Sequence, residues 1–587
     1  MEFYEKVSPV FSWKKYTIPT PTLCPDCRQQ RRLSFRNERK LYKRKCDATG
    51  KDIVSIYSPD KQFKVYHQDY WWGDAWNPMS YGREFDFGRV FFEQLKWLID
   101  TVPKQNVLWA NNENSDYCNL TADNKNCFLI FESSNNEDCL YGYWLQKCRD
   151  CTDCNFMHGC EHCFESFDCF NCYDSRYLFS CKNCTTSAFL EDCIWCDHCF
   201  GCVNLSNKEY HIFNKAFTKD AYGREILKYA HNITFKETFH ALSLQFPKKN
   251  LRILNSSNCL WSQIQDSKNC IFSFHAYDAE DCKFCEHVWR NADWCMDVST
   301  AGREAQYIYE SINCWIGVYN FNSCVQCWTG KNLMYCLFSH NINQCFGCVC
   351  LKNQSYCIFN KQYTKEEYEI LVPRIIEHMM KTGEWGEFFP SSLSPFGYNE
   401  TVAMEYFPMT RDSVIARNET IQETTEALDS HASLHFIRND GSKNSLLHWP
   451  IFNWSDYEAP FPKVDKIIPA NKLPDDISKI PDDILNWAIE CEVTKKPFRI
   501  IKQELEFYRK HNLPIPRRHP DQRHLDRMAL RNPRKLYERK CDKCGKDMIT
   551  TYAPCEVKPS LEAPLGCAPE RKEVVYCEEC YEREVIG

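Results

Sequence analysis

Two cysteine pairs near the C-terminus have the spacing of metal ligands. Cys541 and Cys544 form one Cys-x2-Cys knuckle, and Cys577 and Cys580 form a second. Four thiolates in two tight knuckles are the arrangement that tetrahedral Zn²⁺ requires, with Zn–S bonds of about 2.3 Å. Gly545 follows the first knuckle, where backbone amides commonly turn toward the sulfurs. We therefore predict one structural zinc site here, the alternative being four unrelated core cysteines.

A copy of this module stands at the other end of the chain. Residues 36–52 read RNERKLYKRKCDATGKD and residues 531–547 read RNPRKLYERKCDKCGKD, at an offset of 495. This similarity indicates an internal duplication. The N-terminal copy keeps Cys46 but replaces the other three thiols by Thr49, His67 and Tyr70.

A metal site in the N-terminal copy would need further ligands. Cys24 and Cys27 form another Cys-x2-Cys pair, and together with Cys46 and His67 they would supply three thiolates and one imidazole. The alternative is that Cys24 and Cys27 have lost their partners and are merely buried. Cys491 has flanking residues similar to those of Cys46, but a lone cysteine is more often part of a core.

Basic residues are concentrated around these knuckles. Residues 27–46 carry a net charge of +8 and residues 517–546 carry +7, although the whole chain carries −7. Arginines at helical spacings of three and four form a stripe suited to phosphates. The alternative is a helix face that pairs with the acidic body of the protein. The predicted nucleic-acid contacts are Arg28, Arg31, Arg32, Arg36, Arg39, Arg531, Arg534, Lys535, Arg539 and Lys540.

The middle of the chain has periodic cysteines. All sixteen cysteines from Cys118 to Cys202 are separated by multiples of three, and a longer period connects Cys118, Cys139 and Cys160. Such a repeat predicts a β-solenoid, here with a coil of about 21 residues. Asn or Asp often precedes the cysteine, which suits turns. The pattern leaves open whether the thiols or the neighbouring aromatic side chains face the axis.

Cys-x2-Cys pairs on adjacent coils of this length would bring four sulfurs together. Such a group could bind Zn²⁺ or an iron–sulfur cluster, since both take four thiolates. The alternative is that cysteine, a small and easily buried residue, fills a narrow solenoid without metal. The predicted groups are Cys148/Cys151 with Cys169/Cys172, Cys160/Cys163 with Cys181/Cys184, and Cys324/Cys327 with Cys345/Cys348.

Composition restricts the class of protein. A hydrophobic content of 43% with 26% charged residues is typical of a folded, soluble chain. No apolar run approaches the roughly 18 to 20 residues of a membrane span, and the start of the chain lacks the apolar core of a signal peptide. We expect a cytoplasmic location and no membrane partner. Disulfides are then a less favoured use of the 39 cysteines than metal binding or burial.

The modules and the repeat together resemble a known group of proteins. The runs LCPDCRQQRRLSFRNERKLYKRKCDATGKD and HPDQRHLDRMALRNPRKLYERKCDKCGKD, with CFGCVNL and EWGEFFPSSLSPFGYNE, are similar to an uncharacterised cysteine-rich, zinc-ribbon-bearing family of small-genome, candidate-phyla bacteria. The resemblance covers nearly the whole chain. It implies treble-clef-like zinc modules around a repeat domain and carries no established activity.

The predicted fold is mainly β, a cysteine-rich solenoid in two blocks flanked by two duplicated treble-clef or zinc-ribbon-like modules. Cysteine is absent from residues 373–490, so we expect that segment to wrap the solenoid, with a mobile polar insert near residues 411–448. Both blocks end in the same cap sequence at an offset of 146, followed by a helix. The predicted domains are 1–80, 81–117, 118–228, 229–372, 373–490 and 491–587.

These features favour a non-enzymatic protein. Our first hypothesis is a zinc protein that binds nucleic acid, with structured RNA as the favoured ligand, through two basic modules on a rigid solenoid. The second is a thiolate protein that holds several zinc ions or iron–sulfur clusters for metal storage or electron transfer. A structural or protein-interaction scaffold is a third. An enzyme with a cysteine nucleophile is disfavoured, because no His/Asp group singles out one thiol.

Overall fold

The computed structural model divides the chain into two compact units. Unit 1 comprises Met1–Asn106, Leu251–Tyr457 and Arg534–Leu536, and unit 2 comprises Val107–Asn250, Glu458–Pro533 and Tyr537–Gly587. The structure describes the chain apart from residues 1, 230–234, 260–263, 271–275, 278–310, 313–314, 320–323, 327, 431–450, 533, 555–572 and 587. The prediction of a mainly β, cysteine-rich solenoid is confirmed.

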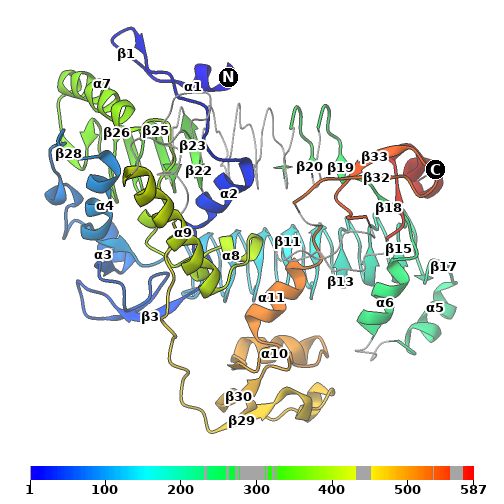
Figure 1. Cartoon of the computed structure of the whole chain (residues 1–587). Helices are drawn as coiled ribbons and strands as arrows, with labels where there is room; N and C mark the ends of the chain where they lie inside the picture. The colour runs from blue at the N-terminus through cyan, green and yellow to red at the C-terminus, as the bar shows by residue number, and fades with distance from the viewer. Residues whose placement is uncertain are drawn as a thin grey trace. The chain divides into compact units, whose positions relative to one another are not determined.

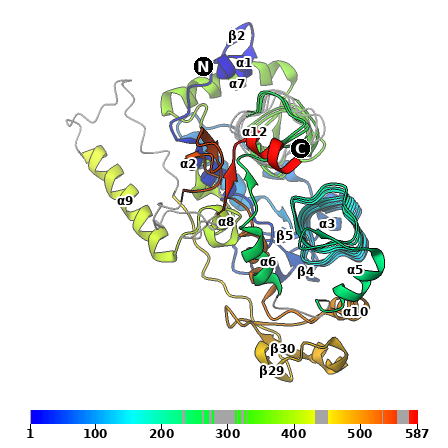
Figure 2. The ribbon, with the colours of Figure 1, turned by 90° about the vertical axis from the view of Figure 1, so that its right-hand side faces the viewer.

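Unit 2 contains the first solenoid block as one 11-stranded sheet, parallel except for its final antiparallel pair (Figure 1). Seen along its axis, the block is a narrow four-sided tube (Figure 2). Its strands are β7 (Trp109–Ala110), β8 (Asn119–Ala122), β9 (Phe131–Ser134), β10 (Tyr143–Gln146), β11 (Asn155–His158), β12 (Phe167–Phe170), β13 (Arg176–Phe179), β14 (Ala188–Glu191), β15 (Phe200–Val203), β16 (His211–Ile212) and β17 (Lys215–Ala216).

The coil is shorter than predicted. Tyr143 pairs with Asn155, and Asn155 pairs with Phe167. One coil therefore has 12 residues, the separation of the stacked side chains of Asn124 and Asn136. The prediction of a coil of about 21 residues is wrong. Each coil consists of four sides of equal length, which is why every interval between inward cysteines is a multiple of three. The longer period is one coil plus three sides, so it connects positions on different sides of the tube.

The corners of the tube are built from left-handed residues. Nearly every third residue from Asp123 to Phe213 has a φ between +44° and +65°. Asn, Asp and Gly tolerate this conformation best, which explains why Asn or Asp so often precedes a cysteine. Aromatic and other side chains also occupy corners, for example Phe156 and Trp195. The packing of the stacked coils therefore overrides local preference at those positions.

The residue after each corner faces the axis. The cysteines from Cys118 to Cys202 are buried and form one core with Ile130, Leu145 and Met157. This settles the orientation that the sequence left open: the thiols point inward. An asparagine ladder accompanies them, in which Asn136 Nδ2 donates to Asn124 Oδ1 at 2.8 Å.

Unit 1 contains the second solenoid block. Its strands β25 and β26 pair at the same separation of one coil, for example Leu333 with Cys345. The described strands are β19 (Ile253–Leu254), β20 (Ile264–Gln265), β21 (Ala276–Tyr277), β22 (Ser311–Ile312), β23 (Trp315–Tyr319), β24 (Cys324–Val325), β25 (Trp328–Met334), β26 (His340–Phe346), β27 (Cys357–Ile358) and β28 (Lys361–Gln362).

Both blocks end in the same cap, as predicted. Asn214 Nδ2 donates to the Val203 carbonyl at 2.8 Å, and Asn360 Nδ2 donates to the Val349 carbonyl at 2.8 Å. Each cap is a hairpin followed by a helix. These helices are α5 (Lys219–Ile226), which starts at the N-cap Thr218, and α7 (Lys365–Thr382).

Each end of the chain contributes a hairpin, a short strand and a helix. The elements of the N-terminal copy are β3 (Tyr42–Lys45), β4 (Asp52–Ser55), β5 (Val65–Tyr66) and α3 (Gln68–Trp72), and those of the C-terminal copy are β32 (Tyr537–Lys540), β33 (Asp547–Thr550), β34 (Val575–Tyr576) and α12 (Glu578–Tyr581). A helix precedes each hairpin at the 495-residue offset, α2 (Pro25–Leu33) and α11 (Pro520–Met528).

The remaining elements are short, with one exception. The predicted mobile insert begins as a helix, α9 (Arg411–Ser430), because residues 411–430 lack both Pro and Gly; residues 431–448 lie outside the described part. The other helices are α1 (Glu2–Val7), α4 (Phe91–Thr101), α6 (Phe235–Ser243), α8 (Ala403–Tyr406) and α10 (Lys502–Lys510). The remaining strands are β1 (Val10–Phe11), β2 (Lys14–Lys15), β6 (Lys104–Gln105), β18 (Lys248–Lys249), β29 (Lys466–Pro469), β30 (Trp487–Glu490) and β31 (Pro497–Phe498).

A helix that crosses a membrane is long and apolar. Among the described residues, no helix combines the two properties.

Candidate metal centre

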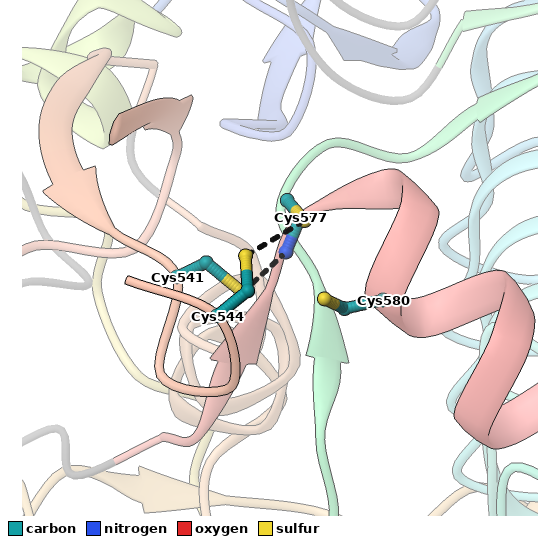
Figure 3. Close-up of side chains that lie close together, drawn as sticks. All are labelled: Cys541, Cys544, Cys577 and Cys580. Atoms are coloured by element: carbon teal, nitrogen blue, oxygen red, sulfur yellow. Dashed lines mark hydrogen bonds between the residues drawn. The ribbon is translucent and has the colours of Figure 1, made fainter. Parts of the chain in front are cut away.

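The four predicted C-terminal ligands come together. Cys541 and Cys544 lie in the turn between β32 and β33, whereas Cys577 and Cys580 lie at the start of α12, and their side chains converge (Figure 3). All four sulfurs lie within 4.8 Å of one another. Cys541, Cys577 and Cys580 are buried and Cys544 is exposed. The group can therefore hold a metal ion.

The spacing of the sulfurs fits a tetrahedral ion. Cys544 Sγ and Cys577 Sγ are 3.8 Å apart. Four thiolates with Zn–S bonds of about 2.3 Å lie about 3.8 Å from one another along the edges of the tetrahedron. The distance is far longer than the S–S bond of about 2.0 Å in a disulfide.

The backbone around the site favours a thiolate. Burial alone would raise the pKa of the Cys541 thiol, but backbone N–H groups directed at its sulfur lower the pKa to about 6. One of them is the N–H of Cys577, whose nitrogen lies 3.2 Å from Cys541 Sγ. Metal ligands must be deprotonated, so these N–H groups prepare the sulfur for an ion.

Unit 2 fixes both knuckles in place. Strand β34, which leads into Cys577, pairs in parallel with β18 through Lys248 and Val575. Lys248 Nζ in turn lies 2.6 Å from a carboxylate oxygen of Glu191 on the last coils of the first block. The module is thereby joined to the solenoid by a backbone ladder and by a buried ion pair.

The predicted N-terminal ligand set is not assembled. Among the described residues, Cys24, Cys27, Cys46 and His67 do not form a group with mutual separations under 4.8 Å. Cys24 Sγ accepts from the backbone N–H of Cys27 as the N-cap of α2, and His67 Nδ1 accepts from the backbone N–H of Asp69 as the N-cap of α3. Cys24 and His67 thus lie at the starts of two different helices, and the predicted set of four ligands is not brought together.

The N-terminal knuckle nevertheless keeps the backbone of a metal module. Cys46 N donates to the Lys51 carbonyl at 2.8 Å, and Cys541 N donates to the Lys546 carbonyl at 2.9 Å. The His67 N–H is directed at Cys46 Sγ at 3.3 Å, just as the Cys577 N–H is directed at Cys541. The fold of the knuckle has therefore survived where the ligands have not.

A third knuckle of the same kind surrounds Cys491. Cys491 N donates to the Lys496 carbonyl at 3.0 Å, and the Thr494 N–H is directed at Cys491 Sγ at 3.4 Å. His519 lies at the start of α11, and its Nδ1 caps that helix. The similarity in sequence between Cys491 and Cys46 indicated this module. Cys491 is buried in a core, as expected of a lone cysteine.

The predicted solenoid ligand groups are also wrong, because they assume the longer coil. The register places Cys160 beside Cys148 and Cys163 beside Cys151, whereas Cys169 stacks on Met157. Cys181 and Cys184 likewise follow Cys169 and Cys172 at the spacing of one coil. Among the described solenoid cysteines, no three sulfurs lie within 4.8 Å of one another.

The solenoid thiols face backbone carbonyl oxygens. Cys151 Sγ lies 3.3 Å from the Arg149 carbonyl and 3.4 Å from the Cys160 carbonyl. The same two contacts recur at Cys163, with the Glu161 and Cys172 carbonyls at 3.4 and 3.6 Å. Burial raises the pKa of the Cys118 thiol to about 12, whereas hydrogen bonds from neighbouring thiols lower the pKa of Cys163 to about 6, so the column contains both thiol donors and sulfur acceptors.

The predicted ligand group of the second block is described only in part. Cys327 and the side chain of Cys324 lie outside the described residues, so the predicted group with Cys345 and Cys348 is not placed. Cys345 and Cys348 are buried, and Cys348 Sγ lies 3.4 Å from the Cys357 carbonyl. Their environment is that of the first block.

The N-terminal basic stripe is buried, so it is not the exposed phosphate surface that we predicted. Arg31 forms an ion pair with Glu387 at 3.2 Å and lies over the ring of Phe388. Arg36 pairs with Glu38. The physical reason is that α2 packs against the run EWGEFFPSSLSPFGYNE of its own unit, which supplies carboxylates and rings. The exposed fractions of Arg28, Arg31, Arg32 and Arg36 are 5%, 2%, 1% and 4%, and Arg39 is half-buried.

The C-terminal cations are more accessible but largely engaged. Arg534 Nη2 donates to the Tyr406 hydroxyl at 2.8 Å. Arg539 lies 2.9 Å from Asp542, and Lys540 lies 2.9 Å from Asp547. Lys535 is exposed and Arg531 is half-buried.

A second donor group escaped sequence analysis. Asp150, His162 and His511 bring three potential ligand atoms within 4.8 Å of one another in unit 2. Asp150 and His162 are separated by one coil, so their proximity is invisible when the coil is taken to be longer. No pattern in the sequence links either residue to His511.

Comparison of the chain with protein-family models, with curated proteins and with solved structures gives no match.

Proposed function

We propose that the protein is a non-enzymatic, metal-stabilised scaffold whose C-terminal module binds one Zn²⁺ through Cys541, Cys544, Cys577 and Cys580. The observation that carries the proposal is the convergence of these four sulfurs at the separation of a tetrahedral site. With all four positions taken by thiolates, the role of the ion is to hold the two knuckles together and fold the module. Among the described solenoid cysteines, no three sulfurs converge as these four do, which argues against storage of many metals.

The proposal predicts one zinc ion per chain, measured by elemental analysis of the purified protein. Replacement of Cys577 by Ser should remove this ion and unfold the module, because binding to a structural site supplies much of the folding free energy of such a module. Limited proteolysis between residues 537 and 587 should become rapid, while the first solenoid block stays resistant. The matched control is Cys491→Ser, which alters a knuckle of the same backbone but should retain the ion. Retention of one zinc by Cys577→Ser contradicts the proposal.

A second candidate function is the binding of a polyanion such as RNA, through cations other than the predicted arginines. Lys43, Lys51 and Lys64 of the N-terminal module are exposed and form no ion pair with the described residues. Phosphate contacts of this kind give an affinity that falls steeply with salt and has little sequence preference.

This candidate predicts that changing Lys43, Lys51 and Lys64 together to Glu weakens RNA binding and reduces its salt dependence by about one charge per lost contact. Fluorescence anisotropy with a labelled RNA hairpin at several salt concentrations measures both quantities. Lys540→Glu serves as a control, since Lys540 is already paired with Asp547. If the triple variant binds as the wild type does, this second candidate is rejected.

A further inference from the structure

The group formed by Asp150, His162 and His511 lies on the outside of the first solenoid block. Asp150 and His162 occupy the same corner of two consecutive coils, and His511 directly follows α10. One oxygen of Asp150, Oδ2, lies 2.9 Å from His162 Nδ1 and 3.2 Å from His511 Nε2. The three side chains are only partly buried, so an ion from solvent can reach them.

The group opens into a cavity of unit 2 with a volume of about 540 Å³. The cavity lies over the corners and sides of the later coils, and α5 lines part of its wall. His162 and His511 both line it, together with His198, Arg176, Phe200 and Tyr222. An ion held by the three donors would therefore face a space large enough for a small molecule.

Two imidazoles and one carboxylate form a ligand set with a definite chemistry. This set binds Zn²⁺, Fe²⁺ and related divalent ions and leaves coordination positions open, in contrast to a closed four-thiolate site. We propose that Asp150, His162 and His511 form a second metal site, specific for a divalent transition ion, whose open positions face the cavity. This inference is independent of the proposed scaffold function.

Lys510 is the competitor for this site. Its ammonium group contacts the same oxygen of Asp150, so it competes with an ion for that oxygen. The Lys510 side chain is 58% exposed, and it can turn into solvent when an ion arrives. Removal of the ammonium group should consequently make the site bind metal more tightly.

The test uses the full chain, loaded first with one equivalent of Zn²⁺ and then titrated with Co²⁺ alone. Equilibrium dialysis and elemental analysis count the bound ions, and the visible spectrum identifies the ligands. We expect one further equivalent of Co²⁺ without the thiolate-to-cobalt bands that a cysteine site gives. His162→Ala and His511→Ala should lower the affinity for this equivalent at least tenfold, whereas Lys510→Met should raise it.

The matched control is His198→Ala, which removes a histidine of the same cavity that is not part of the group. It should leave the second equivalent intact. The proposal is overturned if the wild type takes up no second ion, if His198→Ala weakens binding as much as His162→Ala, or if Lys510→Met fails to tighten it. The Lys510 variant retains all three donors, so it tests the site even if a histidine variant is unstable. Loss of the zinc equivalent would instead bear on the scaffold proposal.

Discussion

At the scale of single residues, the buried arginines change how the basic segments are understood. A guanidinium group is rarely buried without a carboxylate or a ring, and Arg31 has both in Glu387 and Phe388. In the duplicated helix α11, Arg523 and Arg527 are also buried, and both contact Asp153 of the solenoid. The two copies of this helix, α2 and α11, thus each pack within their own unit through buried arginines. These charges therefore stabilise the fold.

His340 is a buried histidine whose environment makes stability depend on pH. It is 2% exposed, its ring lies 5.5 Å from that of Trp71 and 5.0 Å from that of Trp72, and burial lowers its pKa to about 3. The unfolded chain has an ordinary histidine pKa of about 6.5, so it takes up the proton first as the pH falls. The associated stability is present above pH 6.5 and is lost progressively toward pH 3.

We therefore predict that unit 1 loses about 2 kcal/mol of unfolding free energy between pH 7 and pH 5 through His340, at about 1.4 kcal/mol per pH unit below 6.5. Urea unfolding followed by tryptophan fluorescence measures this loss. His340→Leu should abolish it, whereas His240→Leu, at an exposed position of the other unit, should not. An equal pH dependence in wild type and His340→Leu would show that the buried histidine is not its source.

At the scale of elements, the solenoid corner is the critical feature. A left-handed φ costs an ordinary residue about 1–2 kcal/mol, and a β-branched residue is the least tolerant. Asn135 has a φ of +57° and an exposed side chain, and its backbone N–H donates to the Ala122 carbonyl of the preceding coil. The corner is therefore held by the backbone ladder between coils.

Asn135→Val should destabilise unit 2 by about 1–2 kcal/mol, and Asn135→Gly should be close to neutral because glycine adopts this φ freely. Lys125→Val, at the middle of a side where the backbone is not left-handed, gives the control for adding a β-branched residue to the surface. Differential scanning calorimetry of the three variants measures the effect. Equal stability of the Val and Gly variants at position 135 would contradict the left-handed corner.

At the scale of the whole molecule, the described cysteines differ in their exposure to solvent. Those of the first block are buried and donate to carbonyl oxygens, whereas Cys24 and Cys544 are exposed. Thiol reactivity requires access of the reagent to the sulfur, and the first-block thiols are buried inside the tube. The first-block cysteines are thus core residues of the solenoid.

Alkylation of the native protein, mapped by mass spectrometry, should therefore modify Cys24 rapidly and leave the sixteen cysteines from Cys118 to Cys202 unmodified. Cys544 should be protected by zinc and become reactive when a chelator is added. Denaturation should make all 39 cysteines reactive. Rapid modification of several first-block thiols in the folded protein would instead favour a role in metal storage.

The features determined by the sequence alone are those set by local spacing. The Cys-x2-Cys pairs at Cys541 and Cys577 identified a group of four sulfurs that could hold a metal ion, because each knuckle keeps its two sulfurs close together. The three-residue period identified a solenoid, and the repeat at an offset of 146 identified the two caps. Each of these signals lies within a few residues or within a repeat of the same chain.

The tertiary structure decided everything that depends on stacking or docking. The coil length follows from which strands pair, and intervals that are multiples of three fit several coil lengths equally well; only the pairing of Tyr143 with Asn155 selects the observed one. The burial of Arg31 required Glu387, which is 356 residues away. The contact between Asp150 and His511 likewise joins a solenoid corner to the residue after α10. Partners so distant in sequence leave no periodic or local pattern, so only the packed fold shows which cations are neutralised and which donors meet.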